Sequence, residues 1–79
     1  MYNAVVKRLQ ELMAERKLTK NSLAYISAVP PTTVRNIFNG KSKNPGVVTL
    51  KLLCDGMGIT ITEFFDSPIF RELEIEDIK

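Results

Sequence analysis

The chain has 79 residues, enough for one domain with one hydrophobic core, and 44 % hydrophobic with 25 % charged residues is the composition of a folded globular protein. It contains no histidine and only one cysteine, which excludes an intramolecular disulfide and an imidazole-based catalytic triad and argues against structural zinc. No apolar run approaches the ~20 residues of a membrane span. We therefore expect a cytoplasmic binding protein with no membrane segment, metal, cofactor or enzymatic activity.

The formal net charge of +2 is unevenly distributed along the chain. Nine basic and four acidic residues precede Asp66, which gives that part a net charge of +5. Five acidic and two basic residues follow from Asp66 onward, which gives a net charge of −3. A basic body with an acidic tail suits a domain that binds a polyanion, although the same split occurs in proteins that bind nothing charged.

Two helices are predicted in the first third of the chain. Apolar residues recur at the spacing of one helical stripe in Val5, Leu9, Leu12 and Met13. This spacing predicts an amphipathic helix over about residues 3–17. A second helix is predicted over about residues 20–27, with Thr19 as its N-cap, because the threonine hydroxyl can accept a free backbone N–H. It must end before Pro30, since the residue before a proline avoids helical backbone angles.

A third helix is predicted over about residues 31–38 and a fourth over about residues 47–57. Pro31 suits the first position of the third helix, because its missing N–H would have no partner there. Gly40 follows that helix and predicts a left-handed C-terminal turn. Gly56 weakens the last turn of the fourth helix by ~1 kcal/mol relative to alanine, and nothing in the sequence accounts for it.

The end of the chain divides into a short helix and a tail. A capping box of Thr60 and Glu63 predicts a fifth helix. The compact domain is expected to span residues 1–66, and residues 67–79 are expected to form an acidic C-terminal tail. This tail is either a solvated, disordered segment or a dimer contact. The fold class expected is therefore a compact, all-α domain of five helices.

The most informative unit spans about residues 20–39, where a tight turn joins two short helices. Such a helix-turn-helix can place its second helix in the major groove of B-DNA, which is ~12 Å wide. The geometry requires a small residue where the helices cross, a small residue in the turn and a branched apolar anchor in the second helix. These requirements are met by Ala24, Ala28 and Val34.

The segment that begins at Leu23 reads LAYISAVPPTTVRNIFNGKSKNPGVVTLKLLCDGMGITITEFF. It resembles the lambda-repressor-like, or Cro/Xre-type, helix-turn-helix family of bacterial and phage regulators, and the resemblance extends from about Val5 to Phe65. The Asn-Gly-Lys after the third helix, the Lys-x-Pro loop, the leucine-rich fourth helix and the Gly-Ile-Thr before the fifth match in order. The resemblance implies a sequence-specific repressor that binds double-stranded operator DNA as a homodimer and inserts the helix at about residues 31–38 into the major groove.

The resemblance also implies which residues contact DNA. Base contacts are expected from three residues on the outer face of the third helix: Thr32, Arg35 and Asn36. Other contacts are expected from Pro31 and Thr33, and phosphate contacts from Lys20, Asn39, Lys41 and Lys43. Arginine can pair bidentately with guanine, asparagine can do so with adenine, and the threonine methyl can contact thymine. The family has a polar base-reading residue where Pro31 stands, so we expect only a van der Waals contact there.

A second function stays open beside DNA binding. The same fold can serve as a protein-interaction module, such as an antitoxin subunit or an assembly adaptor, in which the third helix or the tail binds another protein. A partner that competes with DNA for the third helix would favour this alternative. An enzyme is disfavoured, because no carboxylate is expected in a pocket or beside a nucleophile.

Overall fold

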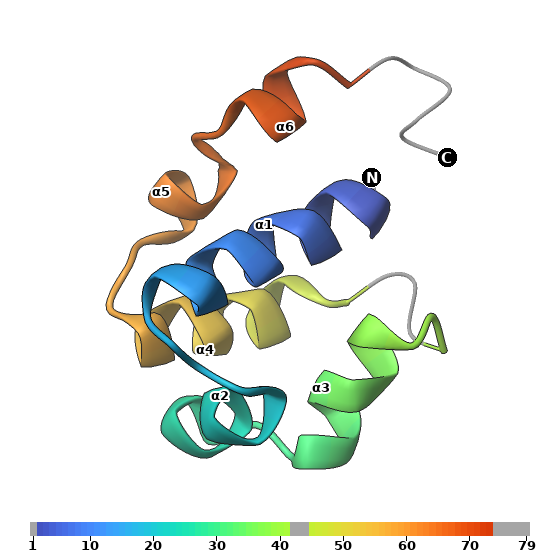
Figure 1. Ribbon diagram of the computed structural model, residues 1–79, viewed down its shortest axis with the longest axis vertical. Helices are drawn as coiled ribbons and strands as arrows, with labels where there is room; N and C mark the ends of the chain where they lie inside the picture. Colours follow the sequence, from blue (N-terminus) through green and yellow to red (C-terminus); the bar gives the residue numbers. More distant parts are fainter. Residues whose placement is uncertain (1, 42–44, 74–79) are drawn as a thin grey trace.

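A computed structural model describes residues 2–41 and 45–73, and in these ranges the chain is all-helical, with no strand (Figure 1). The helices are α1 (Tyr2–Glu15), α2 (Lys20–Ser27), α3 (Pro31–Phe38), α4 (Val47–Met57), α5 (Ile61–Phe65) and α6 (Pro68–Arg71). The predicted all-α fold is confirmed, with one short helix more than expected. None of the helices in the described ranges is both long and apolar enough to cross a bilayer.

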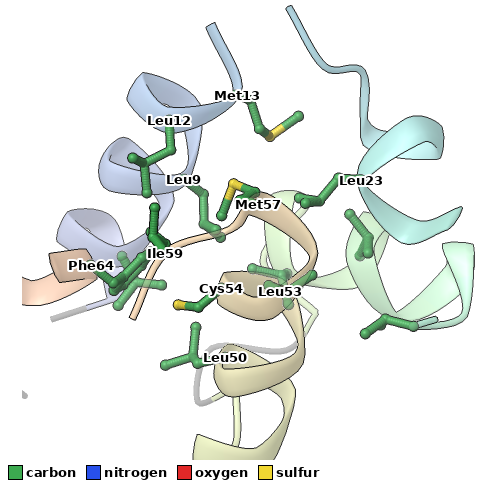
Figure 2. Close-up of a cluster of buried hydrophobic side chains, with 14 of the residues drawn as sticks. Leu9, Leu12, Met13, Leu23, Leu50, Leu53, Cys54, Met57, Ile59 and Phe64 are labelled. Carbon is green, nitrogen blue, oxygen red and sulfur yellow. The ribbon is translucent and has the colours of Figure 1, made fainter. Parts of the chain in front are cut away.

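The five helices from α1 to α5 share one hydrophobic core. The largest fully buried side chains come from every one of these helices: Leu9, Leu23, Val34, Ile37, Leu53, Cys54 and Phe64. In Figure 2, Leu9 of α1 and Leu23 of α2 point toward Met57 and Leu53 of α4. Burying a leucine side chain contributes about 1.5–3 kcal/mol, so these contacts hold the short helices in place.

Arg8 of α1 and Arg16, which directly follows α1, hold the C-terminal ends of α5 and α4. Arg16 donates from Nε to the carbonyl of Met57 over 3.0 Å, and Arg8 donates from Nε to the carbonyl of Phe64 over 2.8 Å. The last carbonyls of a helix lack partners within it, and the helix dipole favours a cation there. These two positive charges therefore stabilise the fold.

Gly56 allows α2 to pack closely against α4. A Cβ added at Gly56 would lie 2.3 Å from Oγ and 2.9 Å from Cα of Ser27. Ser27 is buried, and its hydroxyl makes no hydrogen bond within the described part of the chain. The glycine that the sequence left unexplained is thus required by contact between α4 and the backbone of α2.

Helical structure continues past residue 66, where the sequence indicated the end of the compact domain. Ser67 is buried, and its Oγ accepts the N–H of Ile69 over 3.3 Å, which caps α6. Phe70 of α6 packs against Phe65, with 4.8 Å between the ring centroids. The first part of the predicted tail is therefore packed on the domain, and residues 74–79 lie outside the described residues.

Candidate nucleic-acid interface

Helices α2 and α3 lie at the opposite end of the molecule from α5 and α6 (Figure 1). Ala24 of α2 and the anchors Val34 and Ile37 of α3 are buried, as the sequence predicted. The turn passes through Ala28 in the left-handed region, at φ 55° and ψ 34°. The N–H of Val29 donates to the carbonyl of Ala24 over 3.1 Å and closes the end of α2. Buried contacts on one side thus leave the opposite face of α3 outward.

That outward face carries the three predicted base-reading residues. Thr32 and Arg35 are exposed and Asn36 is half-buried. Nη2 of Arg35 lies 3.4 Å from Oγ1 of Thr32, one turn earlier, so the two side chains share a face of the helix. Together a guanidinium, a hydroxyl and an amide supply the donors and acceptors that read base edges in the major groove.

The start of α3 has little backbone capacity left for a phosphate. Pro30 stands at the N-cap and makes no side-chain cap, while its carbonyl accepts the N–H of Thr33 over 2.9 Å. Pro31, the first helical residue, has no N–H to donate. Backbone contacts from this end are therefore limited to the N–H of Thr32, other contacts must come from side chains, and the exposed Pro31 can offer an apolar surface only.

Lys20, the first residue of α2, lies beside the last residue of α3. Its Nζ is 5.1 Å from the centroid of the Phe38 ring, which is within the range of a cation–π interaction. Phe38 is half-buried and packs against the core. The ring thereby holds the ammonium group of Lys20 near the C-terminal end of α3, next to the other predicted phosphate contacts.

Two further phosphate candidates follow α3. Oδ1 of Asn39 accepts the backbone N–H of Lys41 over 3.0 Å, which leaves the amide NH₂ of Asn39 as a donor. Gly40 between them has a φ of +85°, so the predicted left-handed turn is confirmed. Lys41 is exposed, and the predicted contact Lys43 lies outside the described residues.

The charge around this surface is of one sign. The sequence has no acidic residue between Glu15 and Asp55, so α2, α3 and the loop after them carry only basic charged side chains. Within the described ranges, Lys20, Arg35 and Lys41 form no ion pair. This acid-free run locates the surface better than the net charge of the part before Asp66, because that charge also counts Arg8 and Arg16, which bind the ends of α5 and α4.

One residue at this surface was not expected from the sequence. Tyr2 of α1 donates from its hydroxyl to the carbonyl of Ile37, in the last turn of α3, over 2.7 Å. Residues 2 and 37 are far apart in the chain, and no local pattern joins them. Only the fold brings the start of α1 to the end of α3.

Two short helices in this arrangement, the second basic on its outer face, define a helix-turn-helix DNA-binding domain. The model of the Cro/C1-type HTH DNA-binding domain matches residues 8–68, and the chain belongs to this family. The protein is therefore a DNA-binding regulator of the helix-turn-helix class, and the resemblance noted in its sequence is confirmed.

A solved structure agrees with this membership. The crystal structure of the prophage Lp1 protein 11 is similar to this chain, with 33 % sequence identity and a TM-score of 0.79. The similarity covers 91 % of this chain and 95 % of that chain, so it includes α1 as well as the helix-turn-helix. No curated protein matches the sequence.

Proposed function

We propose that the protein is a sequence-specific repressor that binds double-stranded DNA with α3 in the major groove. The observation that carries this proposal is the outward face of α3, where Thr32 and Arg35 lie exposed, together with the exposed basic side chains of Lys20 and Lys41 near the C-terminal end of the same helix. Base-reading side chains with cations at one end of their helix match the division of labour in protein–DNA interfaces, in which base contacts specify and phosphate contacts fix the register.

A homodimer is part of the proposal. The eight residues of α3 make a rod about 12 Å long, at about 1.5 Å per residue, which spans only a few base pairs. Two such rods related by a two-fold axis would read two half-sites about one helical turn, ~34 Å, apart. Occupying a promoter in this way excludes competing proteins, and repression in the cytoplasm is its simplest consequence. The function is binding, with no catalytic step.

Selection of bound duplexes from a random double-stranded pool tests the proposal. We expect one enriched motif whose two halves are inverted copies with centres about 10 base pairs apart. Enrichment of a single half-site would contradict the dimer, and a folded protein that enriches no sequence would contradict specific DNA recognition. In the second case, competition by a protein partner for the face of α3 would favour the interaction module instead.

A further inference from the structure

The last turn of α3 is held by α1 as well as by α2. The hydroxyl of Tyr2 donates to the Ile37 carbonyl over 2.7 Å, in a partly buried position. This carbonyl is one of the last four of α3. The last four carbonyls of a helix accept no hydrogen bond from an N–H within that helix. In Figure 1 the start of α1 and the end of α3 lie on the same side of the molecule, at the right of the view. The hydroxyl therefore caps α3 from another helix.

The same hydroxyl lies at the turn that leads out of α3. A Cβ built on Gly40 would be 3.8 Å from the oxygen of Tyr2, in ordinary van der Waals contact, so the hydroxyl lies beside this turn. On either side of Gly40 stand Asn39 and Lys41, whose side-chain-to-backbone hydrogen bond shapes the start of the loop. One hydroxyl is thus bonded to the end of α3 and lies beside the segment that carries two proposed phosphate contacts.

Helix α1 is a firm support for this contact. Arg8 binds it to the end of α5, Arg16 directly after it binds the end of α4, and its apolar face is part of the core. The other tie at the end of α3, Lys20 over the Phe38 ring, uses a charge that a DNA phosphate would attract away. The bond from Tyr2 is neutral and partly buried, so a DNA phosphate does not draw it away as it would the ammonium group of Lys20.

We propose that Tyr2 is a positioning residue for DNA recognition: its hydroxyl fixes the end of α3 and the Gly40 turn so that base and phosphate contacts form in one register. This inference rests on the proposed DNA-binding function. Its physical basis is the narrow geometry of hydrogen bonds, which weaken once donor and acceptor move beyond about 3.2 Å. A helix end displaced by about 1 Å would therefore lose contacts to base edges before it lost general attraction to the phosphates.

Tyr2→Phe tests the proposal, because it removes one oxygen and keeps the ring. Tyr25→Phe is the matched control, since Tyr25 lies on α2 with 88 % of its surface exposed. Two quantities are measured at a temperature where all variants are folded. The first is amide hydrogen exchange at Asn39 and Lys41 in the free protein, and the second is the affinity for the selected operator and for an unrelated duplex at equal salt.

For Tyr2→Phe we expect amide exchange at both positions to be about three- to tenfold faster, and the affinity for the operator to fall by a similar factor. The affinity for the unrelated duplex should change less than about twofold, since its contacts are electrostatic. Tyr25→Phe should change none of these quantities. Unchanged exchange, or an equal loss of affinity for both duplexes, would overturn the positioning role.

The failure of the proposed function gives a different result. If the unmodified protein binds all duplexes alike, sequence-specific recognition is wrong and Tyr2 has no recognition to position. If the unmodified protein is selective and Tyr2→Phe is equally selective, only the role of Tyr2 is wrong. The exchange measurement uses no DNA, so it reports independently whether the hydroxyl holds the end of α3.

Discussion

Arg35 is one of the three residues proposed to read bases, and its guanidinium can make a bidentate contact. It is exposed on the outer face of α3, and its guanidinium lies beside the hydroxyl of Thr32. A bidentate arginine–guanine pair is worth about 1–3 kcal/mol against the wrong base. Arg35→Ala should therefore lose about 5- to 150-fold of discrimination at one base pair of each half-site. Measuring affinity for every single-base variant of the operator checks this.

Arg71→Ala is the control for that experiment. It removes the same charge from α6, at the other end of the molecule, where Arg71 is paired with Asp66. Discrimination should stay unchanged in this variant. An equal loss in both variants would show that net charge, rather than a base contact by Arg35, sets the affinity.

Gly56 and Ser27 should act on stability as a coupled pair. In Gly56→Ala, the new Cβ collides with Ser27, and overpacking of this kind costs about 1–3 kcal/mol. This outweighs the gain of about 1 kcal/mol in helix propensity. Ser27→Gly removes the side-chain atoms that the new Cβ would meet. The double variant Ser27→Gly with Gly56→Ala should therefore recover part of the loss, measured as the free energy of unfolding in urea.

Additive effects of the two substitutions would contradict the contact, because residues that touch show coupling in a double-mutant cycle. Full recovery is not expected, since the Cα of Ser27 also lies 2.9 Å from the new Cβ. The sequence alone could not reveal this pair. From the sequence, Gly56 indicates only that the last turn of α4 is weak. The reason for a glycine there is contact with α2, which lies more than twenty residues away in the chain.

At the scale of elements, the turn between α2 and α3 carries strain that can be removed. Ala28 has left-handed backbone angles, which cost a residue with a Cβ roughly 1–2 kcal/mol. Ala28→Gly should raise the free energy of unfolding by up to about 1 kcal/mol, because the greater freedom of glycine in the unfolded chain offsets part of the relief. Ala28 is exposed, so no cavity follows. Urea titration measures the change.

Ala14→Gly provides the comparison, because Ala14 is exposed within α1 and has no left-handed angles to relieve. There the same substitution should lower the free energy of unfolding by about 0.5–1 kcal/mol. A loss of equal size at both positions would show that the backbone of Ala28 is not strained. The turn at Ala28 also matters for the proposed DNA binding, because it sets the angle between α2 and α3.

Most helix boundaries were predictable, because the signals that set them are local. The hydroxyl of Thr19 accepts the N–H of Ser22, and Thr60 and Glu63 form both bonds of the capping box. Gly58 ends α4 in the left-handed conformation. The sequence left α6 undecided, because a serine followed by a proline can end one helix or begin another, and Ile69, Phe70 and Leu73 fit a helix while the residues from Leu73 on alternate like an edge strand. Packing of Phe70 on Phe64 and Phe65, which is tertiary, decides for a new helix.

For the candidate interface, the sequence predicts which residues of α3 face outward, but it does not predict contacts between α3 and other helices. The helical period alone separates the outward Thr32 and Arg35 from the inward Val34 and Ile37, so the face of α3 could be assigned from the sequence. The contact between Phe38 and Lys20 could not be assigned from the sequence, because Lys20 belongs to another helix. Contacts that cross between elements depend on the packing angle, which no local signal sets.

At the scale of the whole molecule, charge is separated along the long axis. Lys20, Arg35 and Lys41 belong to the end formed by α2 and α3, whereas Glu63, Asp66 and Glu72 belong to the end formed by α5 and α6. Such a separation orients the protein as it approaches a polyanion, with the basic end leading. The acidic residues of α5 and of the segment from Asp66 to Glu72 thus lie at the end of the molecule opposite the surface that is proposed to bind DNA.

This arrangement makes the salt dependence of binding a test of both the interface and the dimer. Each phosphate contact that is lost makes the slope of log affinity against log salt shallower by about 0.9. Lys41→Ala should lower the affinity for all duplexes alike, without changing base preference. Because a homodimer carries Lys41 twice, its slope should change by about 2, whereas a bound monomer would change by about 1.

Lys51→Ala is the matched control for Lys41→Ala. Lys51 lies on α4 and is already paired with the carboxylate of Asp55, so its charge is not free for a phosphate. Its removal should leave the slope unchanged, and a change as large as that of Lys41→Ala would mean that the total charge of the protein governs binding. A slope that neither variant alters would remove Lys41 from the interface and leave Lys20 and Asn39 as its described phosphate contacts.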